Sequence, residues 1–142
     1  MWLILCLALL ASPLQTGAVK AEAAEQVELF DTDEERVVNT FDNTEAFQTE
    51  AQVLLNSVSG RVQELNPPLS HALIVKIPLV PPRQLVHRPA KIDAAIAEMF
   101  VVMPKAGSRR PWMILHTKQY ETLVVEFAGE VDGLKKLVRL QD

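Results

Sequence analysis

The sequence is poor in cysteine, and this shortage removes several kinds of chemistry at once. The only cysteine among the 142 residues is Cys6, which lies in a leader that we expect to be removed on export. The mature chain then has no thiol, which excludes disulfides, a cysteine nucleophile and cysteine-ligated zinc. Eukaryotic secreted domains of this size usually carry disulfides, so their absence favours a bacterial exported protein.

Glycine and aromatic residues are also scarce. The five glycines never stand close enough together for a phosphate-binding or nucleotide-binding loop. Aromatic residues make up 6% of the chain, and Trp112, Tyr120 and Phe127 are better explained as core residues than as a platform for stacked bases. The composition therefore does not favour nucleotide or nucleic-acid binding.

The N-terminus carries a short apolar run typical of a signal peptide. Residues 2–11 are apolar without interruption, and small residues that suit signal peptidase follow at Ala18, Ala21 and Ala23. A membrane-spanning helix needs about 20 apolar residues, so the run is short for an anchor. We predict a signal peptide at 1–21 and one mature domain at 22–142. Because no lysine or arginine precedes the run, an uncleaved N-terminal anchor is the alternative.

The expected mature chain has the composition of one globular domain. Hydrophobic residues make up 49% and charged residues 23% of the sequence, which is typical of a folded chain and not of a disordered one. Residues 22–142 suffice for one hydrophobic core and are too few for two. We therefore expect a single domain that is secreted or extracytoplasmic, at the bacterial cell envelope.

Hydrophobic periodicity predicts both strands and helices. Residues 42–58 have apolar positions at helical spacing, with a capping-box pattern at Asp42 and Glu45 and a helix-ending glycine at Gly60. A shorter helix is expected from about 131 to 140. Strands are predicted at residues 27–30, 36–41, 61–65, 71–77, 97–103, 112–116 and 122–127. Strands joined by short turns pair antiparallel, which predicts an α+β fold: an antiparallel sheet of about five to seven strands, with one long and one short C-terminal helix packed on one face.

Prolines interrupt the centre of the chain. Proline has no amide hydrogen for a strand ladder, so we expect Pro78 to end the strand at 71–77. Pro81 and Pro82 then confine this stretch to a sheet edge or a bulged connection, and a strand can resume at 84–87.

Charge is distributed unevenly along the chain. Between residues 25 and 50, nine acidic residues accompany one basic residue, whereas residues 61–118 contain nine lysines and arginines and three acidic residues. A basic, proline-rich edge could accept a partner strand from an envelope protein, or face an anionic wall or membrane surface. The simpler alternative is that these are outward positions of strands that face the acidic segment. The residues predicted for such a surface are Lys76, Arg83, Arg88 and Lys91.

Three motifs are spread along most of the expected mature chain. They are Val27-Glu28-Leu29-Phe30-Asp31, Lys76-Ile77-Pro78-Leu79 with Pro81-Pro82, and Phe100-Val101-Val102-Met103-Pro104. Together they resemble a group of small uncharacterised exported proteins of Bacillus-type bacteria. The resemblance implies export, and the group has no assigned activity or binding residues to transfer.

No catalytic motif is present. Ser70 and His71 are neighbours, and neighbours on a strand point to opposite faces, which argues against a nucleophile and base pair. His71, His87 and His116 lack metal-ligand spacing, although they would meet if their strands paired. We predict no catalytic residues, no metal and no cofactor.

An acidic run offers oxygen ligands that Ca²⁺ accepts. Asp31-Thr32-Asp33-Glu34-Glu35 is followed at the sixth position by Arg36, where an EF-hand loop needs glycine. We therefore expect an exposed hairpin turn.

The hypothesis that follows is a non-enzymatic exported domain that binds or scaffolds a partner. The alternative is a small secreted hydrolase with an unrecognised active site, and it predicts a pocket that holds two or more of His71, His87, His116 and Glu98. A third hypothesis, association with an anionic membrane surface, predicts salt-sensitive binding.

Overall fold

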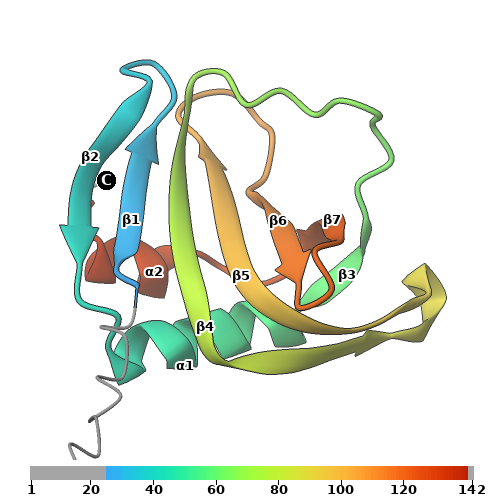
Figure 1. Ribbon diagram of the computed structural model, residues 1–142. Helices are drawn as coiled ribbons and strands as arrows, with labels where there is room; N and C mark the ends of the chain where they lie inside the picture. The colour runs from blue at the N-terminus through green and yellow to red at the C-terminus, as the bar shows by residue number, and fades with distance from the viewer. Residues whose placement is uncertain (1–24, 141–142) are drawn as a thin grey trace, which may run out of the picture.

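The computed structural model describes residues 25–140, and the predicted signal peptide lies outside this part of the chain. One seven-stranded sheet has the order β2-β1-β4-β5-β6-β7-β3, and every neighbouring pair is antiparallel (Figure 1). The strands are β1 (Val27–Asp31), β2 (Arg36–Phe41), β3 (Val58–Arg61), β4 (Ala72–His87), β5 (Ile92–Pro104), β6 (Trp112–Thr117) and β7 (Thr122–Phe127). With two helices added, this confirms the α+β class and the predominantly antiparallel sheet.

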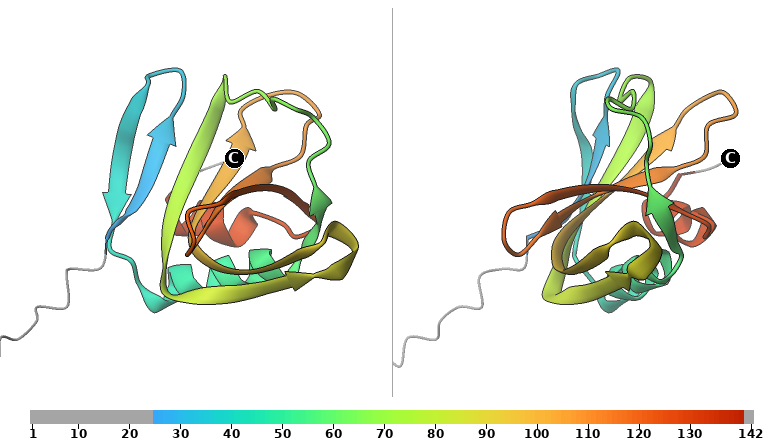
Figure 2. Two further views of the ribbon diagram at one scale, coloured as in Figure 1. Left: turned by 45° about the vertical axis from the view of Figure 1, so that its right-hand side comes forward. Right: turned by 90° about the vertical axis from the view of Figure 1, so that its right-hand side faces the viewer.

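Strands β4 and β5 are longer than the others and give the sheet its curl. They contain 16 and 13 residues, and their register shifts between Pro78 and Arg83. A bulge of this kind bends a strand and increases its twist. Beyond the bend, the far halves of β4 and β5 turn toward β3. The 3-10 turn η1 (Arg88–Ala90), which joins the two strands, therefore contacts β3 (Figures 1 and 2).

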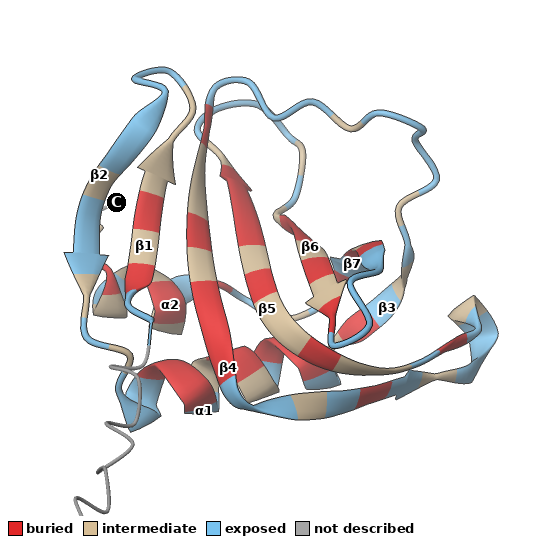
Figure 3. Ribbon diagram, in the orientation of Figure 1, coloured by how far each residue is buried: buried red, intermediate tan, exposed pale blue. Residues whose placement is uncertain are grey.

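The hydrophobic core lies on the inner side of the curl. Helix α1 (Glu45–Asn56) buries Phe47, Ala51 and Leu54, and helix α2 (Asp132–Leu137) buries Leu134. These side chains pack against the inward positions of the sheet. Strand β2 contributes only the partly buried Val38 and Phe41 and remains exposed along most of its length (Figure 3).

The helices differ from the predicted arrangement. Both are short, with 12 and 6 residues, and they are not one long and one short C-terminal helix packed on the sheet. Helix α1 contacts β4 and α2. Because the curled β4 and β5 already enclose much of the core, two short helices suffice to close the remaining side.

Both ends of α1 were also predicted wrongly. The helix begins after Thr44 without any side-chain cap, so the capping box at Asp42 and Glu45 does not form. Gly60 does not end the helix but lies in β3. The ladder between β3 and β7 begins at Val58, shortly after the helix. The carbonyl of Ser57 accepts from the amide of Ala128 at 2.8 Å, so the chain passes from helix to sheet without a glycine turn.

Tertiary pairing also overrides three local strand predictions. Pro78 does not end its strand, because β4 continues through the bulge to His87. Strand β5 begins at Ile92 and not at Ala97, since the residues before 97 pair with the far half of β4. The strand expected at 61–65 lies instead at Val58–Arg61, where β7 is available as its partner.

Candidate functional site

The outer face of the sheet, which is turned away from the core, is apolar over its central strands. Residues directly opposite each other in neighbouring strands share a face. An antiparallel sheet with one solvated face normally places polar residues on that face. Here two adjacent outward rows consist of Val37, Phe30, Ile74, Val102 and Trp112, and of Glu28, Lys76, Phe100, Ile114 and Val124.

Part of this apolar face is covered by the protein itself. Val102 and Trp112 are buried, and Val62, which follows β3, packs against them. The guanidinium carbon of Arg109 lies 5.6 Å from the centre of the Trp112 ring. The cover ends there, and the side of the face nearer β2 remains open.

The open part forms an apolar groove, which we call the outer groove. Its volume is about 190 Å³, and its lining consists of Glu28, Phe30, Val37, Ile74, Lys76 and Phe100. The strand order places Val37 of β2 and Phe100 of β5 on opposite sides, with Phe30 and Ile74 between them. Val37 is 40% exposed and the other three apolar side chains are half-buried.

A charged cluster stands at one end of the outer groove. The Lys76 ammonium lies 3.3 Å from a Glu98 carboxylate oxygen and 3.7 Å from one of Glu25. Glu28 faces Lys76 directly across the β1–β4 ladder. Partial burial opposes the ammonium charge, but the hydrogen bond and the attraction to Glu98, with Glu25 and Glu28, outweigh it and raise the pKa of Lys76. Three carboxylates thus surround one firmly protonated lysine.

Glu98 also faces a histidine. Its Oε1 lies 3.6 Å from Nδ1 of His116, which is its partner across the β5–β6 ladder. The His116 ring packs edge-on against Phe100, with 4.9 Å between ring centres. Glu98 and His116 share a second pocket of about 430 Å³, which Lys118, Tyr120 and Thr122 also line. Two of the four residues expected for a hydrolytic site therefore do meet.

The four residues predicted as one basic surface are not brought together. Lys76 lies on the outer face, whereas Arg83 reaches α1, where Nη1 donates to Oε1 of Gln52 at 2.9 Å. Arg88 and Lys91 lie at the turn between β4 and β5, and the Lys91 amide donates to the Arg88 carbonyl. Only these last two are neighbours in space.

Strand β4 is covered on both sides over its first half, whereas residues 83–87 pair with β5 alone among the described strands. Residues 73–76 pair with β1 on one side, and β5 covers the other side. Beyond the start of β1, Asn43 and Gln48 both donate to the Pro78 carbonyl. The part of the β4 edge next to the β1 ladder is therefore occupied by Asn43, which precedes α1, and by Gln48 in its first turn.

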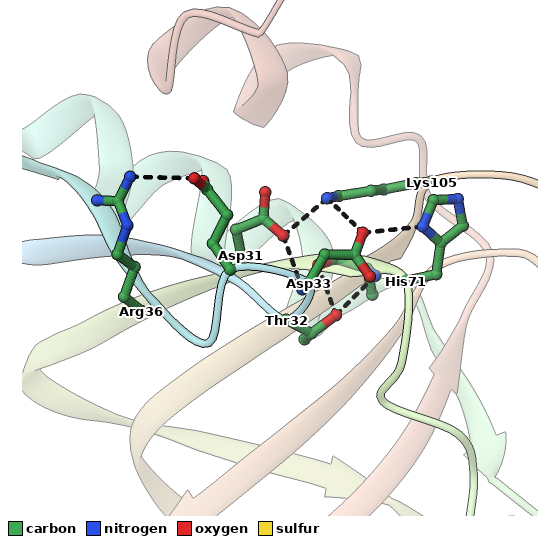
Figure 4. Close-up of polar contacts among 8 residues, drawn as sticks. Asp31, Thr32, Asp33, Arg36, His71 and Lys105 are labelled. Carbon is green, nitrogen blue, oxygen red and sulfur yellow. Dashed lines mark hydrogen bonds and ion pairs between the residues drawn. The ribbon is translucent and has the colours of Figure 1, made fainter.

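The acidic run forms the expected exposed turn, and its carboxylates contact Lys105 and His71. Lys105 Nζ lies 2.7 Å from Asp31 Oδ1 and 2.8 Å from Asp33 Oδ2 (Figure 4). His71 Nδ1 lies 2.9 Å from the same Asp33 oxygen. The hydrogen bond from Lys105 is the main reason that the pKa of Asp31 and Asp33 lies below the ordinary aspartate value. These contacts explain the turn as a structural element.

The three histidines occupy separate environments. His71 contacts Asp33, His116 contacts Glu98, and His87 Nδ1 accepts from the Ala90 amide at 3.2 Å. Within residues 25–140, no group of three or more His, Cys, Asp or Glu side chains could hold a metal ion. No helix in this part of the chain is long and apolar enough to cross a membrane.

Sequence reasoning identified Lys76, Glu98 and His116 but missed the apolar residues of the outer groove. The available signal was the absence of alternation: residues 72–75, 100–103 and 112–115 are apolar without interruption. Such runs are typical of strands that are covered on both faces. The helices cover only the inner face.

The chain matches no protein-family model, no curated protein and no solved structure.

Proposed function

We propose that the chain is a non-enzymatic exported domain that binds a protein partner at the bacterial cell envelope or outside the cell. The observation that carries this proposal is the outer groove, where Phe30, Ile74 and Phe100 are half-buried and Val37 is 40% exposed. Contiguous exposed apolar surface is unfavourable in water and is a common mark of interaction sites. A partner that covers the groove would complete the burial that Val62 and Arg109 provide on the neighbouring part of the face.

The charges at the end of the groove determine the chemistry of the partner. One ammonium, that of Lys76, is shared among the carboxylates of Glu98, Glu25 and Glu28, so net negative charge remains there. Even with His116 protonated, carboxylates outnumber cations there. The complementary occupant is a protein segment that places a bulky apolar side chain between Val37 and Phe100, with a lysine or arginine beside Glu28.

Site-specific photocrosslinking in intact cells tests the proposal. A photoreactive residue at position 37 should capture a partner segment, whereas the same residue at Val53, which is 51% exposed on α1, should not. Mass spectrometry of the captured peptide should identify a bulky apolar residue within two positions of a lysine or arginine.

Two charge variants give the control. With the crosslinker at position 37, Glu28→Lys should reduce capture at least about tenfold, because it places like charges opposite each other. Glu121→Lys, at an exposed position outside the groove, should leave capture unchanged. Equal capture from positions 37 and 53, or a captured segment that is acidic, would contradict the proposal.

Hydrolysis is the second candidate function, because Glu98 and His116 share a pocket. A carboxylate that orients histidine can make it a general base toward water. Two observations weaken this candidate: the 3.6 Å between Nδ1 and Oε1 exceeds a hydrogen bond, and Glu98 also binds Lys76. The buried Thr117 hydroxyl accepts from the Glu121 amide and so is not placed as a nucleophile.

A substrate panel distinguishes the two functions. Purified chain and its His116→Ala variant should both fail to hydrolyse chromogenic esters, amides, glycosides and phosphate esters above the rate in buffer. Turnover by the wild type that is lost in His116→Ala would establish the hydrolase and overturn the non-enzymatic assignment.

A further inference from the structure

The end of the molecule near β3 contains two adjoining cavities. The first has a volume of about 350 Å³ and lies between β3, β7 and the segment before β6. The second, of about 520 Å³, lies between β3 and the turn that joins β4 to β5. Ser59 and Glu126 line both, so the two cavities adjoin each other, and we treat them as the two lobes of one cleft. We call it the basic cleft.

Cations from distant parts of the sequence gather in this cleft. Arg109 and Arg110 line the first lobe, and Arg61 and Lys91 line the second. The only carboxylates in the lining are Glu64 and Glu126. Positive charge therefore exceeds negative charge in the cleft, although the whole chain has a formal charge of -4.

Most of this positive charge is not neutralised by the protein. Arg109 pairs with Glu64. Among the described residues, Arg61 donates to the carbonyls of Ala90 and Lys91, and Arg110 donates to the carbonyl of Ala128. Across residues 25–140 no carboxylate lies within 4.0 Å of the charged nitrogens of Arg61, Arg110 or Lys91.

The first lobe also contains buried donors that no protein atom satisfies. Trp112 is 2% exposed, and its indole N–H has no acceptor among the described residues. The same holds for the buried Nε of Arg109, which stacks over the Trp112 ring. Buried donors are nearly always hydrogen-bonded, so these two, like Nε of Arg83 outside the cleft, are expected to receive an acceptor from water or a ligand.

We propose that the basic cleft binds a linear polymer that carries phosphate groups. A phosphate offers several oxygens to the arginines and to the indole N–H of the first lobe, and arginine suits this geometry well. The second lobe supplies Arg61 and Lys91 for a second phosphate along the same polymer. This site shares no lining residue with the outer groove. The two proposals are therefore tested independently of each other.

Binding of inorganic polyphosphate tests the proposal. Isothermal titration of the purified chain should detect a polyphosphate of about ten units, with an affinity at least about tenfold higher than for inorganic phosphate, because both lobes are engaged. In ¹H–¹⁵N spectra, polyphosphate should move the indole N–H signal of Trp112 downfield. Arg110→Gln should weaken binding by about tenfold, since it removes a charge-assisted hydrogen bond.

Matched controls separate a phosphate site from general charge attraction. Arg36→Gln removes an equal charge from the exposed β2 edge and should leave the affinity unchanged. Polyglutamate of similar length should bind at least about tenfold more weakly, and vesicles with anionic phospholipid should not compete. Equal affinity for polyglutamate, equal weakening by Arg36→Gln, or an unmoved Trp112 signal would overturn the proposal. Competition by the vesicles would contradict a polymer ligand and would identify the phosphate of lipid headgroups as the ligand instead.

Discussion

The buried side chain of Gln48 connects helix α1 to the stretch of β4 that lies beyond its ladder with β1. Its Nε2 donates to the Pro78 carbonyl at 2.8 Å, and its Oε1 accepts from the Val80 amide at 3.2 Å. One amide group thus replaces the strand ladder on this edge of β4. Because buried backbone groups need partners, this contact explains how a proline-rich segment can remain within the sheet.

Replacing Gln48 by leucine should destabilise the fold. The Val80 amide would lose its acceptor, and the Pro78 carbonyl would keep only the donor from Asn43. We expect a loss of about 1–3 kcal/mol in the free energy of unfolding, measured by chemical denaturation. The neighbouring Thr49→Ala, at an exposed position, should change it by less than about 0.5 kcal/mol. Equal effects of the two changes would argue against this role of Gln48.

Gly129→Ala should be costly and Gly60→Ala should not. A Cβ at Gly129 would lie 2.7 Å from the Ser57 hydroxyl, which donates to the Leu54 carbonyl at the end of α1. We expect the free energy of unfolding to fall by about 1–3 kcal/mol. A Cβ at Gly60 meets no atom within 4 Å, so alanine there should be neutral or slightly stabilising. Thermal unfolding of the two variants compares these sites directly.

Lys105→Gln should remove a stabilisation that depends on pH. Lys105 lowers the pKa of Asp31 and Asp33 in the folded chain. A lowered folded pKa stabilises the fold above the ordinary aspartate value of about 3.9 and ceases to do so as the pH falls through the folded values. Urea unfolding should therefore show Lys105→Gln as the less stable protein near pH 7, and the difference should shrink toward pH 2. A difference that is the same at both pH values would refute this account.

Arg61→Ala should loosen the far end of the β4–β5 hairpin. Its guanidinium is the side chain that ties β3 to the carbonyls of Ala90 and Lys91. Amide hydrogen exchange should accelerate at residues 84–95 and remain unchanged in β6, since local opening requires only the loss of local contacts. Unchanged exchange in the hairpin would show that backbone pairing alone holds it in place.

N-terminal sequencing tests the predicted export signal, which lies outside the described residues. The released protein should begin between residues 19 and 24, because small residues that suit signal peptidase occur there. A mature chain that still begins near Trp2 would identify the segment as an anchor.

The elements that the sequence predicts well are those with a strong local pattern. The hairpin of β1 and β2, the apolar stripe of α1, and strands β6 and β7 all follow from the spacing of neighbouring residues. The far half of β4 and the start of β5 were missed, because proline is a local signal against a strand and their pairing is a long-range contact.

For the candidate sites too, the sequence identifies residue types, whereas the structure shows which residues lie close together. Charge and residue type identified Lys76, Glu98 and His116 as chemically capable, and cysteine usage excluded thiol chemistry in the expected mature chain. The sequence by itself therefore determined the composition of the domain, its α+β class and the inventory of reactive groups. Only the tertiary structure decided that Val37 and Phe100 face one open groove, and that the cavity lined by Arg61 and Lys91 adjoins the one lined by Arg110. These proximities depend on the bend in β4 and on which sheet face the helices cover, and both arise from long-range contacts that spacing along the chain does not specify.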